Sequence, residues 1–299
     1  MPSELQSIVG EKVEAAELQA DPFPHLVIPD LLPEPFFRRL ADSIPPVAEF
    51  QPDDDVKSNL RIMDSNKYFQ ATPEQFRRTW TELRDDLIRD TIAPILVRRL
   101  EGEIREKFAW LFSAELADEI MAGGLTSSDG RIMARRPGYR LNPHSDSAQY
   151  AVTCLLYFTN ADDAESGALC LFRPERPPEL RHTSTYYPAK EEGIDMELVK
   201  EIPIRENLFV SFLNGPMSLH GARVDPGANL DRERLAYQVH VVPRNDPRPE
   251  MDRHLERLDD PLARGRWERY WEGREAKLQR WADEKAAKAA AADDTARGS

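Results

Sequence analysis

Apolar residues follow a helical spacing in the first part of the chain, which predicts several helices there. One predicted helix opens at Pro33 with Phe36, Phe37 and Leu40 on one side, and the prolines at 45 and 46 end it. A second apolar stripe begins after Thr72 and contains Trp80 and Leu87. Pro94 is expected to break or kink this stripe, and a further helical stretch runs from Ile95 to about Phe112. We expect these helices to pack on the outside of a sheet.

The pattern changes between residues 131 and 242, where short apolar runs alternate with turns rich in proline, glycine and aspartate. This alternation is typical of an antiparallel β architecture. The clearest predicted strands are residues 151–158 and 208–212, and a shorter one lies at 26–28. Two polar stretches, residues 47–70 and about 174–200, are interpreted as an irregular loop and as a surface excursion.

Helical spacing returns after Pro243, where Trp267, Trp271, Leu278 and Trp281 recur on one face. Such a stripe is expected to pack against the body of the protein or against a second subunit, which would make a homodimer. Residues 284–299 are rich in alanine, lysine and aspartate, so they are expected to be a fraying helix end and a disordered tail.

Composition and charge narrow the class of protein. The 299 residues are 40% hydrophobic and 31% charged, with a formal net charge of -13. An acidic chain is a poor binder of a phosphate backbone, so no nucleic-acid partner is expected. No apolar run approaches the ~20 residues that cross a bilayer, and Met1 to Gly10 lacks the features of a signal peptide. The cysteines Cys154 and Cys170 lie in apolar segments and are expected to be buried free thiols in a cytoplasmic protein.

The candidate chemistry centres on His144 and Asp146, which are two residues apart. Side chains at i and i+2 of an extended strand point to the same face, so an imidazole and a carboxylate would lie side by side. His220 follows a later predicted strand. Two histidines and one carboxylate form the facial triad of non-haem Fe(II) oxygenases, although the same donors also suit Zn(II). His25, at a strand start, is interpreted as structural.

The residues around these three candidates occur in the order found in one family. Pro137-Gly138 and Pro143-His144-Ser145-Asp146 are followed by an apolar strand ending in Tyr157, by Ser166-Gly167, by His220-Gly221 and by Arg234-Leu235-Ala236. This block resembles the 2-oxoglutarate- and Fe(II)-dependent dioxygenases, specifically the prolyl-4-hydroxylase-like branch.

The resemblance implies an α+β fold with a double-stranded β-helix core, of the jelly-roll or cupin-like kind, flanked by N-terminal helices and a C-terminal helical extension. The β core is expected at about 131–242 within a dioxygenase domain at 21–245. Residues 1–20 would be a lead-in, and residues 246–299 the helical extension.

The resemblance also implies roles for individual residues. His144, Asp146 and His220 would bind Fe(II), and O2 and 2-oxoglutarate would be cosubstrates. Arg234 would hold the distal carboxylate of 2-oxoglutarate, assisted by Tyr157 and Thr153. Arg232 is the alternative to Arg234. The implied reaction hydroxylates an unactivated C–H bond and releases succinate and CO2. Related halogenases lack the carboxylate ligand, so Asp146 favours hydroxylation or a related oxidation.

Strand alternation places Arg234 on one face with Ala236, Gln238 and His240, which is expected to be the barrel interior. Arg135 stands where the family often has a tyrosine near 2-oxoglutarate. Arg135 and His240 are therefore candidates for contact with cosubstrate or substrate.

The substrate and two alternative functions stay open. The family acts on amino acids, peptidyl residues and natural-product intermediates, so a small-molecule or peptidyl substrate is expected. Arginines 131, 135, 136 and 140 are consistent with an anionic substrate and equally with solvated strand positions. A cupin-type enzyme that uses another metal, or a non-catalytic β-sandwich binding protein, would also account for the pattern.

Overall fold

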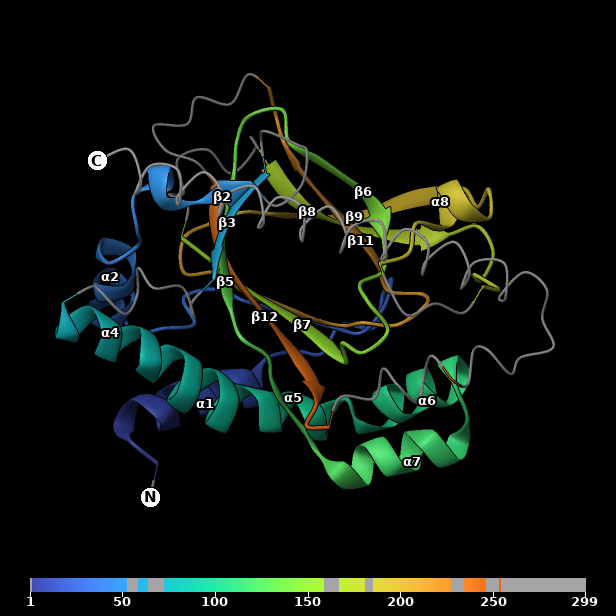
Figure 1. The fold of residues 1–299 in the computed structure, drawn as a ribbon, viewed down its shortest axis with the longest axis horizontal. Coiled ribbons are helices and arrows are strands. Elements are labelled where there is room, and N and C mark those ends of the chain that lie inside the picture. Colours follow the sequence, from blue (N-terminus) through green and yellow to red (C-terminus); the bar gives the residue numbers. More distant parts are fainter. Residues whose placement is uncertain are drawn as a thin grey trace, which may run out of the picture.

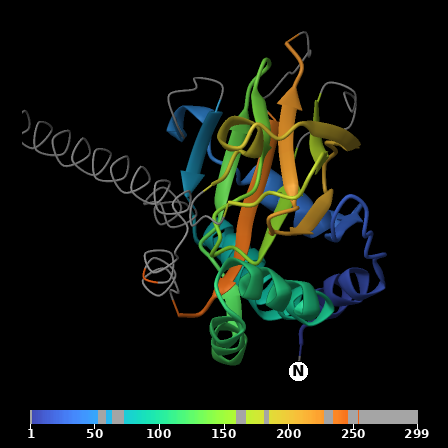
Figure 2. The same cartoon turned by 90° about the vertical axis from the view of Figure 1, so that its right-hand side faces the viewer.

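In the computed structural model, two antiparallel sheets face each other and helices cover the outer side of the larger sheet (Figure 1). The structure describes residues 2–52, 59–63, 73–158, 167–180, 185–226, 234–245 and 253. Figure 2, turned by 90°, shows the helices below the ends of the strands and along one side of the sheets.

The larger sheet contains the strands predicted from the apolar runs at 26–28, 151–158 and 208–212. Each neighbouring pair of strands in it is antiparallel. Its order is β1 (His25–Ile28), β10 (Phe209–Leu213), β7 (Val152–Tyr157), β12 (Arg234–Pro243), β5 (Arg131–Arg135), β3 (Asn59–Met63) and β2 (Gln51–Pro52), with β4 (Leu125–Ser127) paired to β12.

The smaller sheet has the order β6 (Arg140–His144), β11 (Leu219–Val224), β8 (Gly167–Pro174) and β9 (Met196–Pro203). From β5 to β12 the chain passes back and forth between the two sheets, and only β8 and β9 follow one another within one sheet. This connectivity is that of a double-stranded β-helix, so the predicted α+β fold class is confirmed. In the described residues the two sheets stay separate and do not close into a barrel.

The helices lie on the face of the larger sheet that turns away from the smaller one. They are α1 (Glu4–Ala15), α2 (Glu34–Asp42), α4 (Glu74–Thr81), η2 (Glu82–Ile92), α5 (Ala93–Arg99), α6 (Glu101–Leu111) and α7 (Ala114–Gly123), with short turns η1 (Val47–Glu49) and α8 (Pro188–Glu191) elsewhere. The chain does not break at Pro94, so the kink is the part of this prediction that stays open. It remains helical through η2, whose turns are π-helical, and Pro94 falls in the first turn of α5, which follows directly.

Strand alternation divides the apolar side chains between two cores. Leu235, Tyr237 and Val239 of β12 face the helices, whereas Ala236 faces the smaller sheet. On β7, Leu155 and Tyr157 likewise face the smaller sheet. A period of two residues requires this division, because successive side chains leave opposite faces of a strand. The interior between the sheets is therefore lined by the β12 face that carries Arg234, as the alternation predicts.

Two polar stretches differ from the prediction. Residues 47–70 are not wholly irregular, because η1, β2 and β3 form there and β3 pairs with β5 through the buried Leu60 and Ile62. Residues 174–200 are not a simple surface excursion. Ser145 and Tyr186 exchange backbone hydrogen bonds of 3.0 Å, which brings this segment against the site, and β9 adds a strand. Helix α7 and strand β4 were not predicted. The acidic run at 53–55 lies outside the described residues.

The C-terminal extension at 246–299, with its tryptophan stripe, lies outside the described residues except for Arg253, so the homodimer stays a prediction. Cys154 and Cys170 are buried and free, as expected. Across the described ranges, none of the helices has the length and apolar character needed to cross a membrane.

Candidate functional site

Two histidines lie directly opposite one another on neighbouring strands of the smaller sheet. His144 ends β6, and His220 on β11 is its partner in the antiparallel register. Their ring centroids are 4.3 Å apart. A β-bulge follows His220, and a Cβ on the next residue, Gly221, would lie 2.4 Å from the Leu141 carbonyl oxygen. Only glycine therefore allows β11 to approach β6 this closely, and this approach brings the two imidazoles together.

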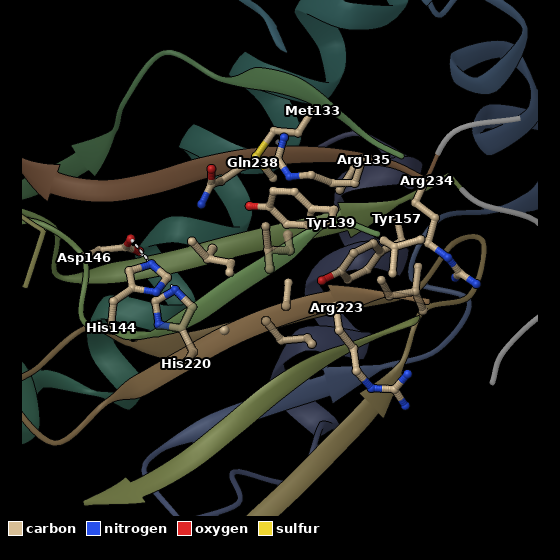
Figure 3. Close-up of a pocket in the computed structure, with 18 of the residues that line it drawn as sticks. Met133, Arg135, Tyr139, His144, Asp146, Tyr157, His220, Arg223, Arg234 and Gln238 are labelled. Carbon is tan, nitrogen blue, oxygen red and sulfur yellow. Dashed lines mark hydrogen bonds and ion pairs between the residues drawn. The ribbon is translucent and has the colours of Figure 1, made fainter. Parts of the chain in front are cut away.

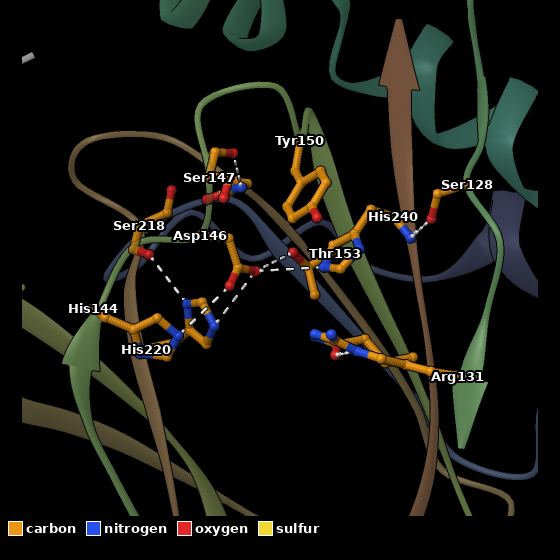
Figure 4. Close-up of polar contacts among 12 residues, drawn as sticks. Ser128, Arg131, His144, Asp146, Ser147, Tyr150, Thr153, Ser218, His220 and His240 are labelled. Atoms are coloured by element: carbon orange, nitrogen blue, oxygen red, sulfur yellow. Dashed lines mark hydrogen bonds and ion pairs between the residues drawn. The ribbon is translucent and has the colours of Figure 1, made fainter. Parts of the chain in front are cut away.

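Asp146 completes the cluster two residues beyond the end of β6. One ligand atom from each of His144, Asp146 and His220 lies within 4.8 Å of the others, and all three residues are buried. The Nε2 atom of His144 is 3.5 Å from Asp146 Oδ1, and the Nε2 atom of His220 is 3.7 Å from Asp146 Oδ2. The three predicted ligands therefore converge on one point (Figure 4).

Backbone hydrogen bonds determine which nitrogen of each ring faces this point. The Nδ1 atom of His144 lies 2.9 Å from the Asn142 carbonyl oxygen, and that of His220 lies 3.4 Å from the Ser218 carbonyl oxygen. A carbonyl oxygen only accepts, so each Nδ1 carries a proton and each ring turns Nε2 inward. Burial, with His144 nearby, lowers the pKa of His220 to about 4, which keeps this ring neutral at pH 7.

The carboxylate of Asp146 is held from the larger sheet. Thr153 Oγ1 on β7 donates a hydrogen bond of 2.7 Å to Asp146 Oδ2. Burial alone would raise the pKa of Asp146, but the imidazoles of His220, His144 and His240 hold that pKa well below its ordinary value. Lone pairs from two neutral rings and an ionised carboxylate thus face one another, and a cation among them would relieve their repulsion.

A buried lysine fixes the loop that follows Asp146. Lys107 of α6 donates from Nζ to the Ala148 carbonyl oxygen at 2.7 Å and to the Tyr150 carbonyl oxygen. Burial lowers the pKa of Lys107 well below its ordinary value, although Asp146 opposes this shift. A helix of the outer layer therefore positions the loop between Asp146 and β7.

The three candidate ligands line one end of a cavity of about 280 Å³ between the two sheets. This volume is near the lower limit for small-molecule sites. Figure 3 shows the triad at one end of the cavity and Arg234 with Tyr157 at the other. The structure therefore brings the predicted metal ligands into one pocket with Arg234 and Tyr157, two of the three predicted cosubstrate residues.

Arg234 and Tyr157 form the far end of this pocket. Arg234 is only 2% exposed and lies beside Gly167, where a Cβ would come within 3.0 Å of Arg234 Nε. The glycine therefore makes room for the arginine side chain. Burial raises the pKa of Tyr157, against the opposing effect of Arg135 and Arg234 nearby. The predicted alternative, Arg232, lies outside the described residues.

Arg135 also lines the pocket, on the strand next to Arg234. Its guanidinium carbon is 4.7 Å from the centre of the Tyr139 ring, and its Nη2 lies 2.8 Å from the sulfur of Met133. Tyr139 was not predicted as a site residue. It follows Pro137-Gly138 in the turn between β5 and β6, and it lines the pocket. The signal for Tyr139 was an aromatic side chain in an otherwise polar turn.

Two other predicted residues lie beside the pocket and do not line it. Thr153 contacts Asp146, as described above, in place of the predicted contact with 2-oxoglutarate. His240 is buried and stacks on Tyr150 with ring centroids 3.8 Å apart, and its Nε2 is 3.7 Å from Asp146 Oδ2. That distance is too long for a hydrogen bond. His240 therefore borders the candidate ligand Asp146 from outside the cavity.

Tyr187 is a pocket residue that the sequence did not reveal. It lies just before α8 and stacks on His144, with ring centroids 5.4 Å apart and an interplanar angle of 27°. His25, interpreted as structural, is remote from the triad. It is buried, and its Nδ1 lies 2.8 Å from the Phe23 carbonyl oxygen.

No protein-family model and no curated protein matches the sequence. Several solved structures are similar in fold. A prolyl 4-hydroxylase from Phytophthora capsici is 14% identical with a TM-score of 0.48, over 88% of this chain and 73% of that chain. A Pseudomonas putida prolyl-4-hydroxylase is 12% identical with a TM-score of 0.43, over 81% of this chain and 100% of that chain.

A third similar structure is the non-haem α-ketoglutarate-dependent epimerase SnoN of nogalamycin biosynthesis. It is 14% identical with a TM-score of 0.42, over 79% of this chain and 82% of that chain. At these identities the likeness concerns the fold alone.

Proposed function

We propose that this chain is a non-haem Fe(II)- and 2-oxoglutarate-dependent oxygenase that hydroxylates an unactivated C–H bond of a small-molecule or peptidyl substrate. The observation that carries the proposal is the shared pocket. A buried His-Asp-His set lies at one end, and a buried guanidinium with a phenol lies at the other.

The donor set fits Fe(II). His144, Asp146 and His220 offer two neutral imidazole nitrogens and one carboxylate, which would hold the metal from one side and leave other positions open. Zn(II) accepts the same donors, so the triad alone does not select the metal. The far end of the pocket supports the choice, because a buried guanidinium opposite the triad fits the distal carboxylate of 2-oxoglutarate.

The pocket also fits a dicarboxylic cosubstrate. Arg234 is buried at the end opposite the triad, where its charge would be neutralised by a carboxylate held through charge-assisted hydrogen bonds. The Tyr157 hydroxyl faces the pocket and would donate to the same carboxylate. Bound Fe(II), 2-oxoglutarate and O2 would supply the oxidising chemistry, with succinate and CO2 as products.

Other residues orient the candidate ligands and exclude water from the pocket. Thr153 holds the Asp146 carboxylate, and Tyr187 covers one face of the His144 ring. Leu155, Leu169 and Ile204 give the pocket apolar walls. Apolar walls around an oxidising centre protect the substrate position from water and from side reactions.

The test is succinate formation by the purified, metal-free protein supplied with Fe(II), 2-oxoglutarate and O2. We expect succinate formation that requires Fe(II), 2-oxoglutarate and O2. Zn(II) in place of Fe(II) should give no succinate. Asp146→Asn, His144→Ala and His220→Ala should each abolish succinate formation while the far-ultraviolet circular dichroism is kept. Asp118→Asn is the matched control, because Asp118 is an exposed carboxylate on α7. Turnover in any of the three ligand variants, or turnover without O2, would contradict the proposal.

A further inference from the structure

The pocket is unusually basic for an acidic protein. Four arginines line it, residues 131, 135, 223 and 234, and Asp146 is the one carboxylate among the lining residues, in a chain whose formal net charge is -13. Arg223 is neutralised from outside the pocket, since it pairs with Glu201 and Asp225 at 2.7 and 2.6 Å. Arg131 therefore adds a positive charge to the pocket besides Arg234, the residue proposed to bind 2-oxoglutarate.

The arginines occupy different levels of the pocket. In the register of β5 and β12, Arg135 is opposite Arg234, and Arg131 is opposite Gln238. Arg131 and Arg135 are four residues apart on β5, which is about 13 Å along a strand. The carbon chain of 2-oxoglutarate has four C–C bonds of about 1.5 Å, so its carboxyl carbons are less than about 6 Å apart. The Arg131 guanidinium extends toward the triad (Figure 4), so we assign to it a ligand group other than the 2-oxoglutarate carboxylate at Arg234.

The Arg131 guanidinium is held by one hydrogen bond, and its two terminal nitrogens can still bind a ligand. Its Nε donates a hydrogen bond of 2.8 Å to Gln238 Oε1, which fixes the plane of the guanidinium. The two terminal nitrogens remain for another acceptor. Within the described parts of the chain, no carboxylate lies within ion-pair distance of Arg131. Figure 4 shows the guanidinium extending from β5 toward the triad, below Thr153 and His240.

We propose that Arg131 binds a carboxylate of the substrate that is oxidised, so that this substrate is a small organic acid. The proposal rests on the proposed function. The terminal edge of a guanidinium matches the two oxygens of a carboxylate. A carboxylate is favoured over a phosphate because Asp146 lies in the same end of the pocket, and a dianion would be repelled more strongly by its negative charge. Arg131 is a specificity-determining residue in this arrangement.

The experiment uses the full chain with a panel of N-acetyl amino acids and the corresponding N-acetyl amino acid amides. Each pair differs only in the carboxylate. The first readout is the increase in succinate formation over the rate without any panel compound. The second is calorimetric binding of the stimulating compound to protein loaded with Ni(II) and 2-oxoglutarate, which does not depend on turnover.

We expect one or more acids to stimulate succinate formation and their amides to fail. Arg131→Gln should weaken binding of the acid by about tenfold or more, which is the range of a charge-assisted hydrogen bond. Arg131→Lys keeps the positive charge but lacks the paired N–H donors of a guanidinium, so it should weaken binding of the acid by less than Arg131→Gln does. A smaller loss of affinity also shows that a variant at this position is folded. In both variants the affinity for the acid should fall by more than the affinity for 2-oxoglutarate, whose distal carboxylate is assigned to Arg234.

Arg140→Gln is the matched control, because Arg140 is an exposed arginine of β6 outside the pocket. Four results would overturn the assignment of Arg131. The first two are stimulation by the amides and a lack of stimulation by every acid. The other two are unchanged acid binding in Arg131→Gln and a 2-oxoglutarate requirement raised as much as the acid affinity is lowered in that variant. If the unmodified protein forms no succinate from 2-oxoglutarate, with or without a panel compound, the proposed function itself is contradicted.

Discussion

Thr153 Oγ1 donates a hydrogen bond of 2.7 Å to Asp146 Oδ2 and so connects the centre of the larger sheet to the loop that follows the smaller one. The hydroxyl binds one of the two carboxylate oxygens and restricts rotation of the carboxylate. Residues that orient a ligand in this way are usually worth tenfold or more in metal affinity. Thr153 therefore contributes to the site without touching the pocket.

Thr153→Val should weaken binding of a divalent metal by about 10–100-fold, because valine keeps the shape of threonine and removes the donor. Thr153→Ser keeps the hydroxyl and should bind nearly as tightly as the unmodified protein. The measurement is a Co(II) titration of metal-free protein followed by its visible absorption. Equal affinities for the valine and serine variants would show that the hydrogen bond does not orient Asp146.

Arg234→Ala should raise the 2-oxoglutarate concentration for half-maximal succinate formation by roughly two orders of magnitude, because a charge-assisted hydrogen bond is worth about 1.5–3 kcal/mol. Arg234→Lys keeps the charge and should cause a smaller increase. The measurement is the rate at a series of 2-oxoglutarate concentrations at saturating Fe(II). If the increase occurs only in Arg232→Ala, the cosubstrate residue is Arg232.

The metal-free protein should lose stability on mild acidification through His220. Burial and His144 lower its pKa to about 4 in the folded state, whereas an unfolded histidine has a pKa of about 6.5. Between these values the unfolded state binds more protons, so the contribution is present above about pH 6.5 and is lost as the pH falls toward about 4. The expected loss is about 2 kcal/mol of unfolding free energy between about pH 6.5 and about pH 5.

Urea unfolding in the presence of a chelator measures this loss, and His220→Phe is the comparison. The phenylalanine variant lacks the titrating ring, so its stability should fall less over the same interval. Parallel pH dependence of the two proteins would show that His220 is not the group responsible. Excess Zn(II) should reduce the dependence in the unmodified protein, because metal binding stabilises the neutral ring.

The local pattern of the sequence determined the elements that carry the site. Alternation of apolar residues predicted β1, β7 and β10, and it predicted that Arg234, Ala236, Gln238 and His240 share the interior face. The two-residue spacing placed His144 and Asp146 near one another. These predictions succeed because strand alternation and helical spacing depend on side chains that are neighbours in the chain.

Only the tertiary structure decided which distant residues meet. His220 faces His144 through strand pairing and a close approach at Gly221, and Tyr187 covers His144 from a segment interpreted as a surface excursion. Among the strand arginines, Arg131 lines the pocket whereas Arg140 does not, although the sequence did not distinguish these two. Strand register and the packing of one sheet on another set these contacts, and they depend on residues far apart in the chain that no local pattern relates.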